Sequence, residues 1–262
     1  MRAPSEPDGR AYAVAPEILR AEIASGSRLT VDIDPEADPG FASAVVSGEL
    51  FSVLLRQRGL LVLHGSGVSK DGVAVGFVGD SGWGKSTLAA SLVTRGWSLL
   101  TDDLLVVDGL DQTAGLPTAI PSHPSMRLSP EAADAVADQG QNQRGVAHER
   151  TTKRHVEWEE AFSTEPASLA HVFVLDPRPS EAHRAVRIPV REAMAQFLYH
   201  TRGQKVLSAA DDRRAHFGQC ASLARAVPAS QLRRRFGLDG MDALCDLVEA
   251  EVESTSPGPT GS

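Results

Sequence analysis

The sequence predicts a single α/β domain of ordinary size, with or without a small appendage, that ends in a C-terminal helical subdomain. Three observations indicate this class. An apolar run over residues 73–78 leads into a glycine-rich segment, and a helix-like run follows over Leu88–Arg95. Strand-like runs continue as far as residue 190, and helical patterns dominate from Arg191 onward. The length of 262 residues and the 42% of hydrophobic residues suffice for one substantial core.

The part of the chain before the glycine-rich segment predicts a helix and a β-hairpin. Residues 39–58 carry apolar side chains at helical spacing, and Gly59 stands where a helix C-cap commonly lies. Residues 69–72 have turn chemistry between two apolar runs, so residues 60–78 are predicted to form a hairpin. Residues 1–38 are treated as an N-terminal segment.

The part after the glycine-rich segment predicts further strands and then helices. A strand begins at Trp97, whereas residues 109–149 are weakly periodic. Within that stretch, residues 137–150 are either a mobile loop that contacts substrate or a plain surface connection. Predicted strands are Arg154–Trp158, Ala170–Leu175 and Ala185–Val190, and predicted helices are Ala193–His200, Ala209–Arg225 and Leu238–Glu253. The expected units are a core over 39–190, a helical subdomain over 191–253 and a disordered tail over 254–262.

The glycine-rich segment matches the phosphate-loop pattern G-x-x-x-x-G-K-[ST] between a strand and a helix. Its glycines allow backbone N–H groups to surround an anion, Lys85 can reach the β- and γ-phosphates, and Ser86 can ligate Mg²⁺. An incidental glycine-rich turn gives no reason for Lys-Ser to open a helix. Trp83 either lines a ligand site or covers an apolar patch. The predicted nucleotide-binding residues are Gly79, Asp80, Ser81, Gly82, Trp83, Gly84, Lys85, Ser86 and Thr87.

An acidic pair, Asp102 and Asp103, follows the next predicted strand. About ten helical residues carry the chain ~15 Å away from the phosphate loop, and five or six strand residues bring it back ~17–20 Å. We therefore expect the pair to lie beside Lys85. Two carboxylates allow one to hold the metal while the other takes a proton from an attacking hydroxyl. The alternative is that the pair is an acidic strand edge and only Asp103 takes part in the site.

Composition excludes several other classes. The net charge of −8 argues against a general nucleic-acid binder, and the basic run Arg233–Arg235 is interpreted as a solvated helix end. Cys220 and Cys245 are expected to be reduced core residues. No run of about 18 apolar residues occurs, so we expect no membrane span, and the sequence predicts a cytoplasmic protein.

Residues 63–108 resemble the catalytic core of HPr kinase/phosphorylase. More broadly, they resemble the HPr-kinase-like serine kinases, relatives of ATP-dependent phosphoenolpyruvate carboxykinase. The family's pattern is a His before a short hairpin, a G-D-S-G-x-G-K-S loop, a helix and an Asp-Asp pair. It occurs here in order as His64, Gly79–Ser86, Leu88–Arg95 and Asp102-Asp103. The resemblance implies a P-loop-containing sheet of the HPr-kinase/PEP-carboxykinase-like type.

The resemblance also implies a function: phosphoryl transfer from ATP to a serine hydroxyl of a peptide or protein, with Mg²⁺. Asp102 would be the general base, and Asp103 and Ser86 would organise Mg²⁺. His64 and Arg127 would lie at the edge of the active site. From the residues alone, His64 would more often be a core or turn histidine, and its position in the pattern makes a role in the site equally well supported. Arg127 is equally a residue that stabilises phosphate or one that pairs with a surface acid.

The chain also departs from the family. The bifunctional members carry Glu where this chain has Thr87, and their glycine-rich C-terminal signature has no counterpart. Phosphorylase activity and HPr as the substrate are therefore not expected. The compact build is similar to stand-alone kinases of peptide natural products, including lasso-peptide tailoring kinases, which act on the C-terminal serine of a peptide. Homo-oligomers occur among relatives. The alternatives are a kinase of small alcohols, a nucleotide-binding regulatory module and, more weakly, a carboxykinase.

Overall fold

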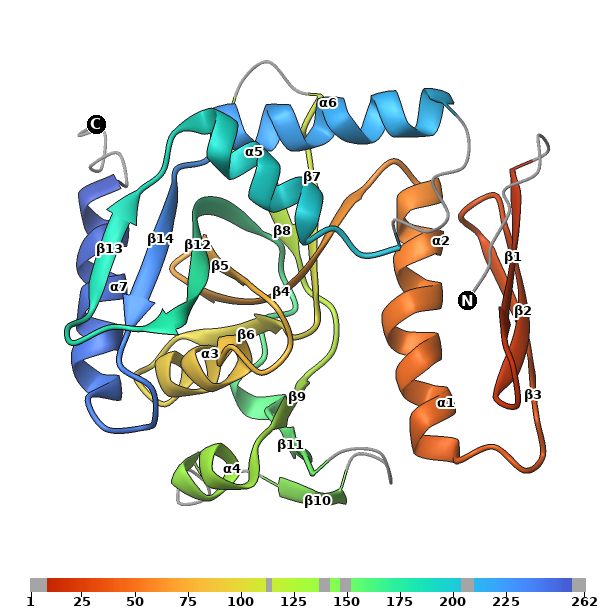
Figure 1. The fold of residues 1–262 in the computed structure, drawn as a ribbon, viewed down its shortest axis with the longest axis horizontal. Helices are drawn as coiled ribbons and strands as arrows, with labels where there is room; N and C mark the ends of the chain where they lie inside the picture. The colour runs from red at the N-terminus through yellow and green to blue at the C-terminus, as the bar shows by residue number, and fades with distance from the viewer. Residues whose placement is uncertain (1–8, 112–114, 137–141, 147–151, 204–209, 256–262) are drawn as a thin grey trace.

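An eight-stranded sheet forms the centre of the structure, and helices cover both of its faces (Figure 1). The structure is a computed structural model that describes residues 9–111, 115–136, 142–146, 152–203 and 210–255. The predicted α/β class is confirmed. The strand order is β13-β14-β12-β5-β4-β7-β8, and β6 also pairs with β4. The strands are β4 (Leu61–Lys70), β5 (Val73–Val78), β6 (Ser98–Thr101), β7 (Leu104–Asp108), β8 (Thr118–Ile120), β12 (Ala167–Pro179), β13 (Arg184–Arg187) and β14 (Ala229–Arg234).

The predicted hairpin over residues 60–78 is confirmed as β4 and β5. Its register pairs Lys70 with Val73 and Gly65 with Val78. A Cβ atom on Gly65 would lie 2.7 Å from the carbonyl oxygen of Phe77, so only glycine allows the two strands to approach this closely. On its other side β5 runs parallel to β12, which places the end of β5 inside the sheet. The loop that follows β5 is therefore held by a central strand.

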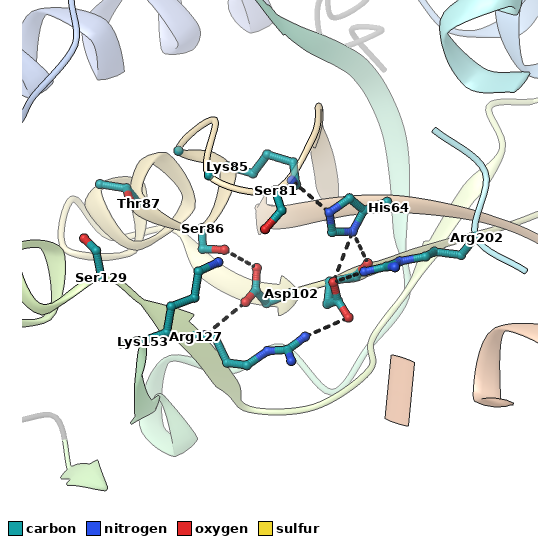
Figure 2. A pocket seen from close by; sticks show the side chains of 13 residues that line it. His64, Ser81, Lys85, Ser86, Thr87, Asp102, Arg127, Ser129, Lys153 and Arg202 are labelled. Carbon is teal, nitrogen blue, oxygen red and sulfur yellow. Dashed lines mark hydrogen bonds and ion pairs between the residues drawn. The ribbon is translucent and has the colours of Figure 1, made fainter. Parts of the chain in front are cut away.

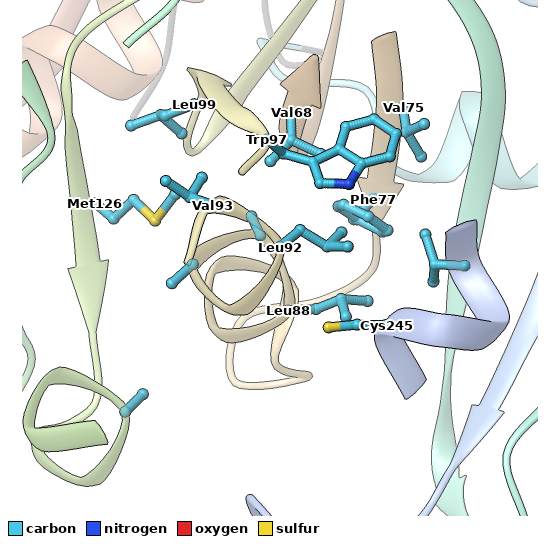
Figure 3. Close-up of a cluster of buried hydrophobic side chains, with 14 of the residues drawn as sticks. Val68, Val75, Phe77, Leu88, Leu92, Val93, Trp97, Leu99, Met126 and Cys245 are labelled. Atoms are coloured by element: carbon cyan, nitrogen blue, oxygen red, sulfur yellow. The ribbon is translucent and has the colours of Figure 1, made fainter. Parts of the chain in front are cut away.

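Helices on each face bury separate apolar clusters. On one face, α3 (Lys85–Val93) and α7 (Met241–Thr255) pack against the sheet, with α4 (Pro130–Val136) beside α3. Figure 3 shows this cluster, in which Leu88 and Leu92 of α3 lie near Phe77. Full burial of one such side chain contributes about 1.5–3 kcal/mol. The other face is covered by α5 (Val190–Tyr199) and α6 (Ala210–Ala226). Both cysteines are buried and free, as predicted.

The N-terminal segment contains a small sheet that the sequence analysis did not anticipate. Strands β1 (Arg10–Ala15), β2 (Leu19–Ala24) and β3 (Arg28–Ile33) pair antiparallel in that order. They pack against the helical stretch of α1 (Pro39–Val45) and α2 (Phe51–Gln57). The predicted helix over 39–58 is thus confirmed, but a π-helical turn, Val46–Leu50, interrupts it. Such turns are frequent at functional sites.

Two further expectations are wrong. The run Arg233–Arg235 is not a helix end, because residues 229–234 form strand β14 inside the main sheet. Leu232 on this strand is fully buried. The charged residues beside it hide the apolar pattern from which a strand would be predicted. The part after Arg191 therefore contains a strand as well as helices. Part of the predicted tail is helical, since α7 runs to Thr255, and residues 256–262 lie outside the described residues.

The predicted loop over 137–150 is partly a strand. Residues Asn142–Val146 form β10, which pairs with β11 (Arg154–Glu157). Strand β11 pairs in turn with β9 (Ser125–Leu128). Residues 137–141 and 147–150 lie outside the described residues, so the loop's predicted role stays a prediction. None of the helices in the described part of the chain has the length and apolar composition needed to cross a membrane.

Candidate active site

The predicted phosphate loop, called the phosphate loop below, joins the end of β5 to the start of α3. Gly82 and Gly84 both have a φ of 86°, in the left-handed region that favours glycine. Helix α3 begins at Lys85, directly after the Gly84 cap. Its positive end and its unpaired backbone N–H groups suit an anion. The local structure is therefore the strand, loop and helix that the motif predicts.

A cavity of about 390 Å³ lies against this loop. Figure 2 shows that its side chains come from the loop, from the acidic pair and from segments far apart in sequence. Its volume falls within the ~300–1,000 Å³ range of small-molecule sites. The predicted residues that line it are His64, Ser81, Gly82, Gly84, Lys85, Ser86, Thr87, Asp102, Asp103 and Arg127.

Lys85 is buried at the floor of the cavity. Its Nζ donates to the carbonyl oxygens of Gly79 and Asp80, at 2.7 and 3.0 Å, and lies 3.2 Å from Nε2 of His64. Burial lowers the pKa of Lys85 to about 8, although the nearby Asp102 carboxylate opposes this shift. These three contacts occupy all three N–H donors of the ammonium, so a phosphate oxygen would have to replace one of them.

Asp102 connects the phosphate loop to the sheet. Its Oδ1 accepts hydrogen bonds from the Ser86 hydroxyl at 2.8 Å and from the Ser66 hydroxyl at 2.6 Å. Its Oδ2 accepts the backbone N–H of Arg127 at 3.1 Å. The predicted return of the acidic pair to the loop is thus confirmed. Ser86, however, contacts Asp102, whereas the sequence analysis paired it with Asp103.

Asp103 is surrounded by two arginines and a histidine. Its carboxylate lies 2.6 Å from Nη2 of Arg202, 2.8 Å from Nη2 of Arg127 and 3.1 Å from Nδ1 of His64. Burial raises its pKa, but the hydrogen bond from His64 and the charges of the two arginines outweigh this, so the pKa lies far below its usual range. Its backbone has a φ of 72°, a conformation held by these contacts.

His64 bridges Lys85 and Asp103. Lys85 can donate to Nε2 only when this nitrogen carries no proton, so the Nδ1–H faces the carboxylate of Asp103. The backbone N–H of His64 also donates to the carbonyl of His200 at 2.6 Å. Of the two interpretations left open by the sequence, the structure places His64 at the cavity and not in the core.

Three of the predicted nucleotide-binding residues do not line the cavity: Gly79, Asp80 and Trp83. The first two hold Lys85 through their carbonyl groups. The ring of Trp83 packs on the apolar cluster under α3 and meets the His200 ring edge-on, with centroids 6.2 Å apart. Trp83 therefore covers an apolar patch, which was one of its two interpretations.

Several residues of the site escaped the sequence analysis. Ser66 could have been found, because strand alternation places it on the same face as His64. Arg202 follows α5 and reaches Asp103 across 99 positions of sequence, for which no local signal exists. Arg234 of β14 donates to the carbonyl oxygens of Trp83 and Asp176 and so connects the phosphate loop to β12. It belongs to the run that was misread as a helix end.

Comparison with known proteins leaves the family open. No protein-family model matches the chain, and no curated protein matches it. Among solved structures, the chain is similar to the Hpr(Ser) kinase/phosphatase from Coxiella burnetii. The identity is 14% over 74% of this chain and 91% of that chain, and the TM-score is 0.38. A likeness of this size carries no functional argument, so function has to be argued from the cavity itself.

Proposed function

We propose that the protein is an ATP- and Mg²⁺-dependent kinase that transfers the γ-phosphoryl group to a serine hydroxyl of a peptide or protein. One observation carries the proposal: a phosphate loop and two adjacent carboxylates line the same cavity. Phosphoryl transfer depends mainly on positioning and on compensation of charge, and both requirements have candidate residues here. The serine acceptor follows from the resemblance of residues 63–108 to the HPr-kinase-like serine kinases.

The donor side of the cavity suits the triphosphate of ATP. Backbone N–H groups of the loop and the start of α3 would surround the phosphates, and Lys85 would contact the β- and γ-phosphates. Arg127, Arg202 and Lys153 also line the cavity. These cations match the negative charge that a transferring phosphoryl group carries.

The oxygen groups next to Lys85 fit Mg²⁺. The Ser86 hydroxyl and Oδ1 of Asp102 lie 2.8 Å apart, and hydroxyl and carboxylate oxygens are ligands that Mg²⁺ prefers. We therefore prefer Asp102 to Asp103 as the carboxylate that acts with Ser86, since Asp103 is already paired with two arginines. When bound with ATP, Mg²⁺ would neutralise charge on the β- and γ-phosphates. Mg²⁺ usually keeps several waters, so few protein ligands are needed.

Asp102 is also the better proton acceptor of the pair. Asp103 has a strongly lowered pKa because His64 and the two arginines stabilise its charged form. A carboxylate stabilised in this way gains less by accepting a proton. Asp102 already accepts hydrogen bonds from two serine hydroxyls, which is the contact that an acceptor serine would make. Its Oδ2 lies on the side of β9, away from Ser86.

The proposal is tested with γ-labelled ATP, Mg²⁺ and pools of serine-containing peptides, HPr-like protein and small alcohols. Lys85→Ala should lose ATP binding and transfer, and Asp102→Asn should bind ATP but transfer at least about a hundredfold more slowly. Exposed positions supply matched controls: Lys70→Ala and Asp71→Asn should behave as the wild type. Mass spectrometry of the labelled products identifies the acceptor class.

Each outcome distinguishes a function. Label on a peptide or protein serine that disappears in both variants supports the proposal. Label only on a small alcohol keeps the chemistry and replaces the substrate. ATP binding without transfer to any acceptor, unchanged in Asp102→Asn, would instead indicate a nucleotide-binding regulatory module.

A further inference from the structure

A second cavity, of about 260 Å³, adjoins the first, and the two share three lining residues: Asp102, Asp103 and Arg127. Neither Lys85 nor Ser86 lines the second cavity, so it lies on the far side of the acidic pair from the phosphate loop. A group placed there would meet the carboxylates from the side opposite the triphosphate. An in-line transfer needs the acceptor oxygen opposite the leaving oxygen across the γ-phosphorus, and entry from this side is compatible with that requirement.

One wall of the second cavity is helix α1 with its π-helical turn. The residues that face the cavity are all small: Gly40, Ser43, Ala44 and Ser47. The backbone of this stretch also approaches the acidic pair closely, because a Cβ atom on Gly48 would lie 3.1 Å from Oδ2 of Asp103. Small side chains leave room for a polypeptide backbone between the helix and the carboxylates.

The opposite wall is strand β9, which forms an edge of its three-stranded sheet. In an antiparallel pair, the N–H and C=O of one residue point to the same side. The N–H of Arg127 donates to Asp102, so the carbonyl of Arg127 also faces away from β11. This edge therefore presents a backbone acceptor toward the cavity. An extended peptide can donate a backbone N–H to this carbonyl, whereas the N–H groups of Ser125 and Arg127 on the same edge are already bound to His123 and Asp102.

We infer that the acceptor is an extended polypeptide segment that lies between α1 and the edge of β9, with its serine side chain in the second cavity. The volume of about 260 Å³ is enough for the side chain of one residue, and the flanking chain would lie outside it along α1 and β9. This inference rests on the proposed kinase function and adds the place where the acceptor binds and its route of entry.

The transfer needs no reactant besides ATP and the acceptor serine. The serine Oγ forms a bond to the γ-phosphorus of ATP, and the bond from that phosphorus to the oxygen of the leaving ADP breaks. The serine hydroxyl proton passes to Asp102, whose Oδ2 lies on the β9 side. The products are a phosphoserine peptide and ADP.

The test fills the second cavity from the helix side. Ala44→Leu places a larger side chain against the acceptor but leaves the lining of the first cavity intact. With an equimolar library of peptides that carry one central serine, we expect at least about a tenfold loss of kcat/KM. ATP binding, measured by calorimetry, should stay unchanged and shows that the variant is folded. Ala250→Leu, at an exposed position of α7, adds the same side chain away from both cavities and is the matched control.

The same assay includes free serine and a set of small alcohols. If the wild type labels small alcohols but no peptide, the kinase function stands and this inference is overturned. If peptides are labelled equally by Ala44→Leu and the wild type, the acceptor does not lie against α1, and the inference is again wrong. If nothing is labelled by the wild type, the proposed function fails and this inference fails with it.

Discussion

The hydroxyl of Ser86 lies 2.8 Å from Oδ1 of Asp102, although 16 positions of sequence separate the two residues. Helix α3 leads the chain away from the phosphate loop, and β6 returns it to the same edge of the sheet. Helix α3 and strand β6 span similar lengths in opposite directions, so the chain returns to the phosphate loop and the two residues meet. It places a candidate metal ligand and a candidate proton acceptor side by side.

Ser86→Ala tests the metal role of this contact. The change removes one oxygen ligand, so the Mg²⁺ concentration that gives half-maximal transfer should rise about tenfold. Ser86→Thr keeps the hydroxyl and should restore the wild-type dependence. The measurement is the rate of labelled product against Mg²⁺ concentration at saturating ATP. Ser91→Ala, further along the same helix, is the control, and an unchanged Mg²⁺ dependence in Ser86→Ala would remove Ser86 from the metal site.

The affinity for ATP should fall as the pH rises through about 8. Lys85 has its pKa lowered to about 8 by burial, so the free protein loses this charge above that pH. Phosphates favour the ammonium and raise its pKa, so binding near pH 8–9 should take up protons. Calorimetry in buffers of different ionisation enthalpy measures that uptake. Lys85→Arg should bind without it, and equal proton uptake by the two proteins would contradict the assignment.

Asp103→Asn should destabilise the protein. The change leaves Arg127 and Arg202 facing a neutral amide, and we expect a loss of about 1–3 kcal/mol in the free energy of unfolding. The pKa of Asp103 is lower in the folded state, so its stabilisation is present above the unfolded pKa of about 3.9 and is lost as the pH falls further. Urea unfolding should show a constant deficit from pH 5 to 8 that shrinks below pH 4. A deficit equal to that of Asp71→Asn would contradict this.

The parts that the sequence predicted are those with a local signal. The hairpin, the phosphate loop and the acidic pair are each specified by residues close together in the chain, and their relative placement follows from element lengths. Strand β14 has no comparable signal, because it carries polar and charged side chains among its buried positions. A helical interpretation was therefore natural for the run that contains Arg234.

The charge environment of the acidic pair could not be predicted in the same way. Arg202 reaches Asp103 only because the segment after α5 bridges to Leu63 of β4, a tertiary contact. The sequence accordingly assigned the metal to Asp103. Once two arginines and His64 are seen around that carboxylate, Asp102 becomes the stronger candidate. Spacing placed the two acids in the site, and only packing distinguished them.

Arg234→Gln should weaken ATP binding without any contact to the nucleotide. Arg234 is buried and donates to the carbonyl oxygens of Trp83 and Asp176, so it holds the phosphate loop against β12. Without this support the loop samples conformations in which fewer N–H groups face the phosphates, and the apparent Kd for ATP should rise about tenfold. Arg235→Gln, at an exposed neighbour, is the matched control.

Unlike a loss of Lys85, the Arg234→Gln change should leave the pH dependence of ATP binding intact, because the titrating ammonium is still present. A flat pH profile in Arg234→Gln would mean that Arg234 acts through Lys85, and an unchanged Kd would mean that the loop keeps its shape unaided.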